Sequence, residues 1–214
     1  VPKAAGSSFY KVLSQWFGRR LHHHRYREFK GRMPRRVRLH KRFSSRYREG
    51  LCIFGHFNRD RGFGVRDYYP EVDQFVTILR DPFELTVSEY FFIRRRQGRA
   101  QWRDQSRVPA VDLPTYLEQA RPNMLNHFPF DLSLDNFEEK LGGAFIHIGI
   151  SEDMQTSVRM IASKLGFPEP ARIEQINRSK RSQRVPYELR QAFEQRHPLE
   201  FAVYDFARRH YDKP

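Results

Sequence analysis

Short apolar runs alternate along the chain with longer stretches in which apolar residues recur at helical spacing. Three runs of apolar or β-branched residues predict buried strands at 51–54, 75–79 and 144–150. Helices are expected over 9–17, from Pro82 to about residue 96, over 112–120 and 134–141, from 151 to Gly166, and from about Pro198. Because strands alternate with helices, we predict one α/β domain, residues 1–214, organised around a central parallel sheet.

The helix predicted after Ser151 carries an apolar stripe, which indicates a packing face and not a cofactor site. Gly166 follows the stripe and is expected to end the helix. His147 lies inside the preceding predicted strand, and we expect a structural histidine whose polar atoms are satisfied. The stripe consists of Met154, Val158, Ile161 and Leu165.

The first eight residues form a small-residue loop that leads directly into an apolar, helix-like stretch. Glycine and alanine let backbone N–H groups approach an anion, the helix presents its positive end, and Lys3 adds a mobile cation. The pattern predicts a phosphate-binding loop, with an ordinary strand-to-helix turn as the alternative. A strand should precede Val1, either in residues upstream of it or as a short stub. The loop consists of Val1, Pro2, Lys3, Ala4, Ala5, Gly6, Ser7 and Ser8.

A second candidate anion site follows the strand at 75–79. Asp81 and Pro82 are typical of a helix N-terminus, which places Arg80 where the strand becomes the helix. Ser88 lies about two turns after Asp81 on the same helix face, so it can share a ligand with Arg80. The alternative for Arg80 is a surface salt bridge.

These motifs, in this order, resemble the PAPS-dependent sulfotransferases, where PAPS is 3′-phosphoadenosine-5′-phosphosulfate. The resemblance spans nearly the whole chain and is greatest to the uronosyl 2-O-sulfotransferase type and its bacterial relatives. It implies a P-loop-NTPase-like three-layer fold, with a central parallel sheet flanked by helices. The residues that carry it are the Pro-Lys-x-x-Gly-Ser-Ser loop, Leu79 to Pro82 with Ser88, Phe54-Gly55-His56, Ile148 to Glu152, and Asn177-Arg178-Ser179.

The resemblance also implies roles for individual residues. Lys3 and the loop from Ala4 to Ser8 would hold the 5′-phosphosulfate of PAPS, and Arg80 with Ser88 would hold the 3′-phosphate, without a metal. Sulfuryl transfer is an in-line displacement, so Lys3 would neutralise the charge that builds up on the leaving phosphate. In relatives a loop comparable to 176–184 covers the nucleotide, which makes Lys180 and Arg181 further donor contacts. The alternative for that loop is an exposed, charged linker.

His56 is the predicted general base for the acceptor hydroxyl. It follows a predicted strand, at the edge where α/β sheets place their ligand crevice, and histidine titrates near neutrality. In the uronosyl enzymes the matching Gly-His carries the catalytic histidine. Two departures are present: Phe54 stands where those enzymes have a second histidine, and Leu85 stands where relatives commonly have arginine. If His56 only supports a loop, an acidic residue of the middle region must act as the general base instead.

Residues 94–132 are expected to form acceptor-side loops and short helices, beginning with a basic stretch from Arg94 to Arg107. Asn123 and Asn126 are candidates for contacts with acceptor or donor, and a role as turn residues is the alternative.

The charge of the chain indicates an anionic partner. The 214 residues carry a net charge of +14, and thirteen Lys or Arg residues lie in the basic insertion 19–48. This run is interpreted as a rim for a polyanionic glycan, a nucleic-acid patch, or a solvated helix and loop. The adjacent histidines 22–24 do not predict a metal site, because neighbouring residues cannot all face one ion.

The cysteine content and the apolar runs bear on the compartment of the protein. Cys52 is the only cysteine, so no intrachain disulfide can form, and no signal peptide or membrane-length apolar run is present. We expect a cytoplasmic protein, with a lumenal catalytic domain separated from its anchor as the alternative. Neither oligomeric state nor the acceptor follows from the residues.

Together with the resemblance, the sequence therefore predicts an enzyme that transfers a sulfuryl group from PAPS to a hydroxyl, with an acidic carbohydrate as the expected acceptor, and releases the bisphosphate product PAP. An ATP-dependent kinase is disfavoured, because the Walker pattern Gly-x-x-x-x-Gly-Lys-Ser/Thr cannot be written through the first loop. A nucleic-acid-binding basic module is the non-enzymatic alternative.

Overall fold

The structure is a computed structural model of the chain, and it describes residues 1–24, 36–37, 50–95, 110–173 and 185–211. Within these ranges four strands form two parallel pairs. Strand β1 (Leu21–His24) pairs with β2 (Cys52–Gly55), and β3 (Phe75–Leu79) pairs with β4 (Phe145–Ile150). The protein is therefore a mixed α/β structure with parallel strand pairing, as its sequence predicts.

The three predicted strands are confirmed to within one residue at each end. Strand β1 was not predicted, because it lies at the start of the basic run 19–48 and its histidines show no apolar period. It forms because it pairs with β2 and because His24 is buried, with its Nε2 atom 2.6 Å from the hydroxyl of Tyr69. Of the three interpretations of the run, the solvated helix and loop does not describe Leu21–His24, which forms a strand, and most of the insertion lies outside the described residues.

Eight α-helices are present in the described ranges, and six of them correspond to predictions. Helix α5 is shifted by three residues toward the C-terminus from its predicted range, because Ser133 to Asn136 forms a turn closed by the Asn136 side chain. Helices α2 and α7 were missed; α2 is a single turn, and α7 is highly polar and buries only Phe193. The helices are α1 (Gly6–Phe17), α2 (Val65–Tyr68), α3 (Pro82–Arg94), α4 (Leu113–Gln119), α5 (Phe137–Ala144), α6 (Met154–Leu165), α7 (Tyr187–Arg196) and α8 (Pro198–Tyr211).

Local chemistry explains where several helices begin and end. The carboxylate of Asp81 accepts a hydrogen bond from the Glu84 amide at 2.9 Å, which confirms the predicted N-cap of α3. Gly166 adopts the left-handed conformation, with φ of 70°, and ends α6 as expected. Short 3₁₀ turns occupy Gly18–Arg20, Leu125–His127 and Ser151–Asp153.

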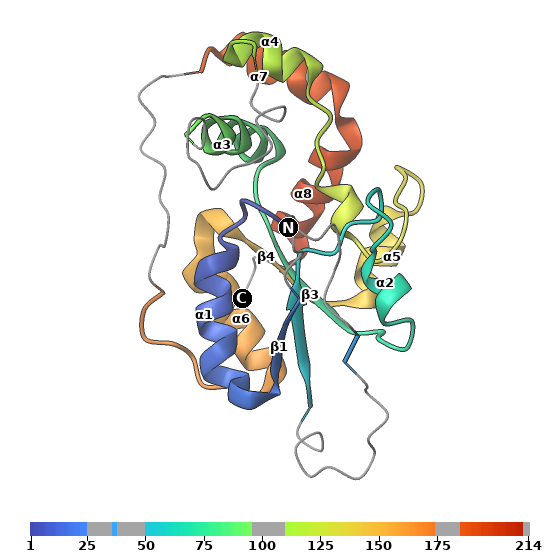
Figure 1. Ribbon diagram of the computed structural model, residues 1–214, viewed down its shortest axis with the longest axis vertical. Coiled ribbons are helices and arrows are strands. Elements are labelled where there is room, and N and C mark those ends of the chain that lie inside the picture. Colours follow the sequence, from blue (N-terminus) through green and yellow to red (C-terminus); the bar gives the residue numbers. More distant parts are fainter. Residues whose placement is uncertain (25–35, 38–49, 96–109, 174–184, 212–214) are drawn as a thin grey trace.

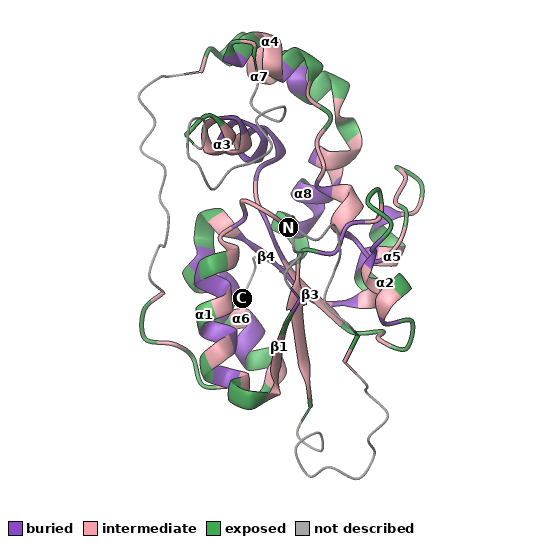
Figure 2. Cartoon of the chain, viewed as in Figure 1, coloured by how far each residue is buried: buried purple, intermediate pink, exposed green. Residues whose placement is uncertain are grey.

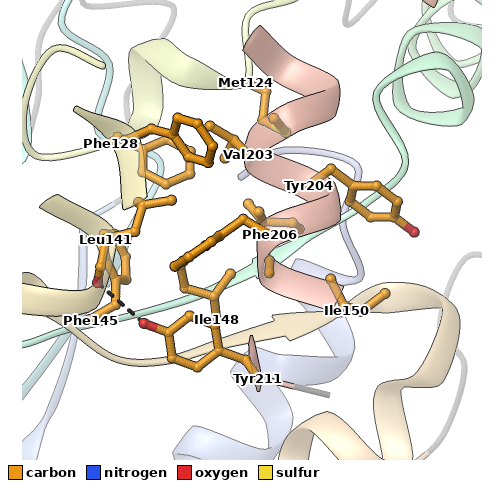
Figure 3. Close-up of a cluster of buried hydrophobic side chains, with 13 residues drawn as sticks. Met124, Phe128, Leu141, Phe145, Ile148, Ile150, Val203, Tyr204, Phe206 and Tyr211 are labelled. Atoms are coloured by element: carbon orange, nitrogen blue, oxygen red, sulfur yellow. Dashed lines mark hydrogen bonds between the residues drawn. The ribbon is translucent and has the colours of Figure 1, made fainter. Parts of the chain in front are cut away.

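Helices cover both sides of the β3–β4 pair (Figure 1). On one side α1 and α6 pack over Ile78 through an apolar cluster, and their purple buried stripes alternate with exposed green residues in Figure 2. On the other side α5 and α8 pack over Ile148 and Ile150, as Figure 3 shows. The Tyr211 hydroxyl at the end of α8 donates to the Leu141 carbonyl at 3.2 Å and ties these helices together.

The hydrogen bonding of His147 differs from the prediction. The residue lies on β4 and is completely buried, but neither ring nitrogen has a hydrogen-bond partner among the described residues. Its ring lies edge-on against Tyr211, with 5.4 Å between the centroids. Burial, assisted by the positive charge of Lys164, lowers the pKa of His147 to about 4. His147 is therefore held neutral in an apolar site. The prediction that its ring nitrogens have hydrogen-bond partners was wrong.

Candidate functional site

The first loop lies at the carboxyl ends of β2 and β3. Arg80, which directly follows β3, donates from its guanidinium to the Lys3 carbonyl at 3.3 Å. His56, which directly follows β2, lies against Gly6: a Cβ atom placed on Gly6 would be 3.5 Å from the imidazole Cε1. The structure thus brings together Lys3, Gly6, Arg80 and His56 from three separate segments.

The backbone of this loop is unusual for its residue types. Lys3 and Ala5 have φ angles of 64° and 54°, in the left-handed region that non-glycine residues seldom occupy. Strain of this kind, about 1–3 kcal/mol per residue, is concentrated at ligand-binding segments. When residues of a loop adopt the left-handed conformation, successive backbone N–H groups point toward the same concave side. This arrangement is called an anion nest.

The loop runs into α1, whose N-terminus is suited to an anion. The first turn contains no acidic residue, and no side chain within the described part of the chain caps it. The first amides of any α-helix lack intrahelical acceptors, so these amides and the helix dipole favour a negative ligand. Ser7 is exposed, whereas Ala4 and Ser8 are 1% and 4% exposed. Ser7 therefore offers its side chain to a ligand, and Ala4 mainly supplies packing.

The Lys3 side chain reaches helix α3. Its Nζ atom lies 3.9 Å from the centroid of the Phe92 ring, and its charge acts on Glu89 one turn earlier. Burial raises the pKa of Glu89, while Lys3 and Arg61 oppose that rise. Burial and the nearby Glu89 together raise the pKa of Tyr116 to about 12.

Sequence reasoning missed Glu89. The local feature that marks Glu89 is its position on α3 between two buried residues, Ser88 and Tyr90, which is unusual for a carboxylate. An acidic side chain beside the lysine of the loop makes Glu89 a second proton-accepting group at the site.

His56 is exposed, and a second histidine lies beside it. The ring of His127 is 6.4 Å from that of His56, centroid to centroid. Nδ1 of His127 donates to the Phe57 carbonyl, which leaves Nε2 unprotonated in the neutral ring. Burial foremost, and then the nearby Val1 ammonium, lower the pKa of His127 to about 3. His127 is thus a neutral hydrogen-bond acceptor, while the exposed His56 is positioned to exchange protons.

His127 was also missed from the sequence, because nothing near it in the chain marks it as functional. It lies in the 94–132 segment predicted to face the acceptor, immediately after Asn126. Only the packing of Leu125–His127 against the loop after β2 places it at the site.

Asn123 and Asn126 have structural roles in this arrangement. The Asn123 side-chain carbonyl accepts from the buried Asn58 at 3.0 Å and from Asn126 at 2.9 Å. The Asn126 carbonyl accepts from the amide of Arg59 at 2.9 Å. These bonds hold the loop after β2 against residues 123–127, so the turn interpretation fits and both residues position the histidines.

Arg80 contacts protein groups as well as the loop, and Ser88 is buried on α3. The guanidinium of Arg80 lies 3.6 Å from the Glu84 carboxylate, as the salt-bridge alternative predicts. Burial lowers the pKa of Arg80, opposed by Glu152 and Asp81. Ser88 is 5% exposed on α3. The residues lie where the sequence places them, and a phosphate here would compete with Glu84 for Arg80.

Arg190 of α7 is a further cation near this site. It donates to both carboxylate oxygens of Asp81, at 3.1 and 2.6 Å, and its guanidinium packs over Phe83 and Phe201. The pair fixes α7 against the start of α3. Lys180 and Arg181, the other predicted donor contacts, lie outside the described residues.

A scan against protein-family models finds no matching family, and searches of curated proteins and of solved structures find no match. In the parts of the chain that are described, no group of three or more His, Cys, Asp or Glu residues is arranged to hold a metal ion. No helix in the same ranges has both the length and the apolar character that crossing a membrane requires.

Proposed function

We propose that this protein is a sulfotransferase that moves a sulfuryl group from PAPS to an acceptor hydroxyl. One observation carries the proposal: the exposed His56 lies against the N-terminus of α1. No side chain of the described residues caps this N-terminus, and the loop before it contains Lys3 and has a strained backbone. The helix N-terminus and the loop suit a phosphosulfate, and the histidine supplies a base within reach of it. The proposal includes the finer fold, a P-loop-like three-layer arrangement.

Each residue has a defined task in the transfer. The amides of Gly6 and Ser7 and the ammonium of Lys3 bind the phosphosulfate and stabilise negative charge on the leaving phosphate. His56 takes the acceptor proton as the new oxygen–sulfur bond forms and the bond between sulfur and the phosphate oxygen breaks. PAP leaves with the electron pair of that bond. The neutral His127 lies beside His56 and is held by the Phe57 carbonyl at Nδ1 and by the Asn58 side-chain amide at Nε2, so it fixes the surroundings of His56.

Arg80 contributes in two ways. Its bond to the Lys3 carbonyl holds the loop in its strained conformation, and its charge attracts the 3′-phosphate. Ser88 adds a hydroxyl from helix α3, which begins two residues after Arg80. An acidic carbohydrate is the proposed acceptor, because the net charge of +14 exceeds what PAPS alone requires.

Isothermal titration calorimetry with PAP, ATP and a short DNA duplex tests the donor assignment. Selective binding of PAP supports the sulfotransferase, whereas preference for ATP indicates a kinase. Preference for the duplex, with a steep salt dependence, indicates a nucleic-acid-binding module. Lys3→Ala should weaken PAP binding, and Lys11→Ala, an equal charge change at an exposed position of α1, is the matched control.

A screen with labelled PAPS against desulfated polysaccharides, small glycosides and tyrosine peptides tests the acceptor. Transfer to an acidic polysaccharide supports the proposed substrate class. Transfer only to tyrosine peptides would replace it.

A further inference from the structure

The loop after β2 folds into a short hairpin beside the candidate site. Asn58 and Phe63 form an antiparallel bridge: the Asn58 amide donates to the Phe63 carbonyl at 3.0 Å, and the Phe63 amide donates back at 3.1 Å. The Gly62 amide donates to the Arg59 carbonyl at 2.8 Å and closes the turn between them. Gly62 has a φ of 69°, a conformation that glycine adopts without strain. Residues 59–62 are therefore the tip of a defined hairpin.

The hairpin is held against the segment 123–131, which lies beside it in Figure 1. The Arg59 guanidinium forms an ion pair with Asp131, and the Asp60 carboxylate accepts a hydrogen bond from the Asn126 side chain. Two of the three charged side chains at the tip are therefore engaged with protein groups. A hairpin fixed in this way loses little conformational entropy when a ligand binds, which favours affinity.

Arg61 is the third charged residue of the tip. Its amide donates to the Asn58 side-chain carbonyl at 3.0 Å, so its backbone is fixed. The residue is exposed, and its guanidinium forms no hydrogen bond or ion pair with any other residue in the ranges that the structure describes. A guanidinium carries several N–H donors arranged in a planar fork. Within the same ranges, these donors are available to a ligand.

The hairpin places Arg61 close to the histidines of the site. Asn58, which accepts from the Arg61 amide, also has its side-chain nitrogen 3.5 Å from Nε2 of His127. The His127 ring lies 6.4 Å from that of His56, centroid to centroid. One side chain thus connects the tip of the hairpin to the pair of histidines that contains the predicted base.

The charge of Arg61 acts on two other groups of the site. Burial raises the pKa of Glu89, and the charges of Lys3 and Arg61 oppose this rise. Burial is the main cause of the lowered pKa of His127, and Arg61 is one of the positive charges that lower it further. Lys3 belongs to the first loop, whereas Arg61 belongs to the hairpin. The two cations therefore act on one carboxylate from separate segments, and only Lys3 is part of the predicted donor loop.

We propose that Arg61 is a specificity-determining residue that binds an anionic group of the acceptor, a carboxylate or a sulfate ester, next to the hydroxyl that receives the sulfuryl group. This inference rests on the proposed function, in which Lys3 holds the donor and His56 takes the acceptor proton. A guanidinium can bind a carboxylate or a sulfate through two parallel hydrogen bonds, so it selects the orientation of the anion as well as its charge. The net charge of +14 attracts any polyanion, whereas a contact at Arg61 distinguishes acceptors by where their anionic group lies.

The test compares sulfuryl transfer to a desulfated uronic-acid polysaccharide, the same polymer after reduction of its carboxylates, and the reduced polymer carrying sulfate esters. Arg61→Gln should lower the preference for an acidic over the neutral polymer, measured as the ratio of kcat/KM values, by about 10- to 100-fold. Arg61→Lys keeps the charge without the planar fork and should retain part of the preference. Arg159→Gln, an equal charge change at an exposed position of α6, is the matched control and should keep the preference of the parent. A loss confined to the carboxylate polymer or to the sulfated polymer identifies which anion Arg61 binds.

Donor-free binding separates this inference from the proposed function. Fluorescence anisotropy measures the affinity of the full chain for labelled oligosaccharides of the two acidic polymers. If Arg61→Gln binds either one about tenfold more weakly than Arg159→Gln, and no form of the protein transfers a sulfuryl group, the anion contact is supported and the proposed function fails. Transfer by the parent, combined with an unchanged preference in Arg61→Gln, would overturn the inference and leave the proposed function standing. An equal loss on acidic and neutral polymers would also overturn it, because a structural defect does not depend on the charge of the acceptor.

Discussion

His147 makes the stability of this protein sensitive to acid. The imidazole is buried on β4 without hydrogen-bond partners in the described structure, and its pKa is lowered to about 4 from a reference value of 6.5. The unfolded chain therefore binds a proton at this residue more readily than the folded chain. Stability is retained above the unfolded pKa and is lost as the pH falls through 6.5 toward 4.

The size of the effect follows from the two pKa values. The full shift corresponds to about 3 kcal/mol, and roughly 2 kcal/mol of it is lost between pH 7 and pH 5. His147→Phe keeps an aromatic ring against Tyr211 but cannot take up a proton. The free energy of unfolding of this variant should fall by about 2 kcal/mol less than that of the parent over the same interval.

Urea denaturation of both proteins at pH 7 and pH 5 measures this difference. His127, whose pKa is also lowered by burial, contributes equally to both proteins and cancels. His210→Gln, at an exposed histidine of α8, is the control and should follow the parent. An equal fall in His147→Phe and the parent would refute the assignment of the acid sensitivity to His147.

Three further outcomes are expected. Lys3→Ala should lower kcat for sulfuryl transfer by about 10²- to 10³-fold while Lys11→Ala does not, which steady-state kinetics with labelled PAPS would measure. His56→Ala should lower kcat by about 10²- to 10⁴-fold and leave PAP affinity unchanged in calorimetry; unchanged turnover would assign the base to another residue. Asp81→Ala should reduce the free energy of unfolding by about 2 kcal/mol, since α3 loses its N-cap and Arg190 loses its partner; a loss below half of that in urea denaturation would contradict the structural role.

Much of the local structure could be predicted from the sequence, because the forces that set it act between near neighbours. The apolar run at 75–79 gives β3, Asp81 caps α3 through the amide three residues later, and Gly166 ends α6 in the left-handed conformation. His56 was placed after the strand at 51–54 for the same reason, and it directly follows β2 in the structure.

Other elements depend on partners far away in the chain. β1 is a strand because β2 pairs with it, although the pattern of Leu21–His24 indicates none. Gly55 has no room for a side chain, since a Cβ atom there would lie 2.6 Å from the His24 carbonyl. Helix α7 is mostly polar, and contacts with α3 and α8 through Arg190 and Phe193 hold it in place.

The sequence by itself determined the α/β pattern, the N-cap of α3 and the end of α6, since hydrophobic periodicity and capping are read over a few residues. Tertiary structure decided that Glu89 and His127 join Lys3 and His56, and that the His147 nitrogens have no hydrogen-bond partner among the described residues. It also decided that β1 pairs with β2 and β3 pairs with β4. Burial and strand pairing determine these features. Both depend on contacts between segments tens of residues apart, and a local sequence pattern does not specify which segments will contact each other.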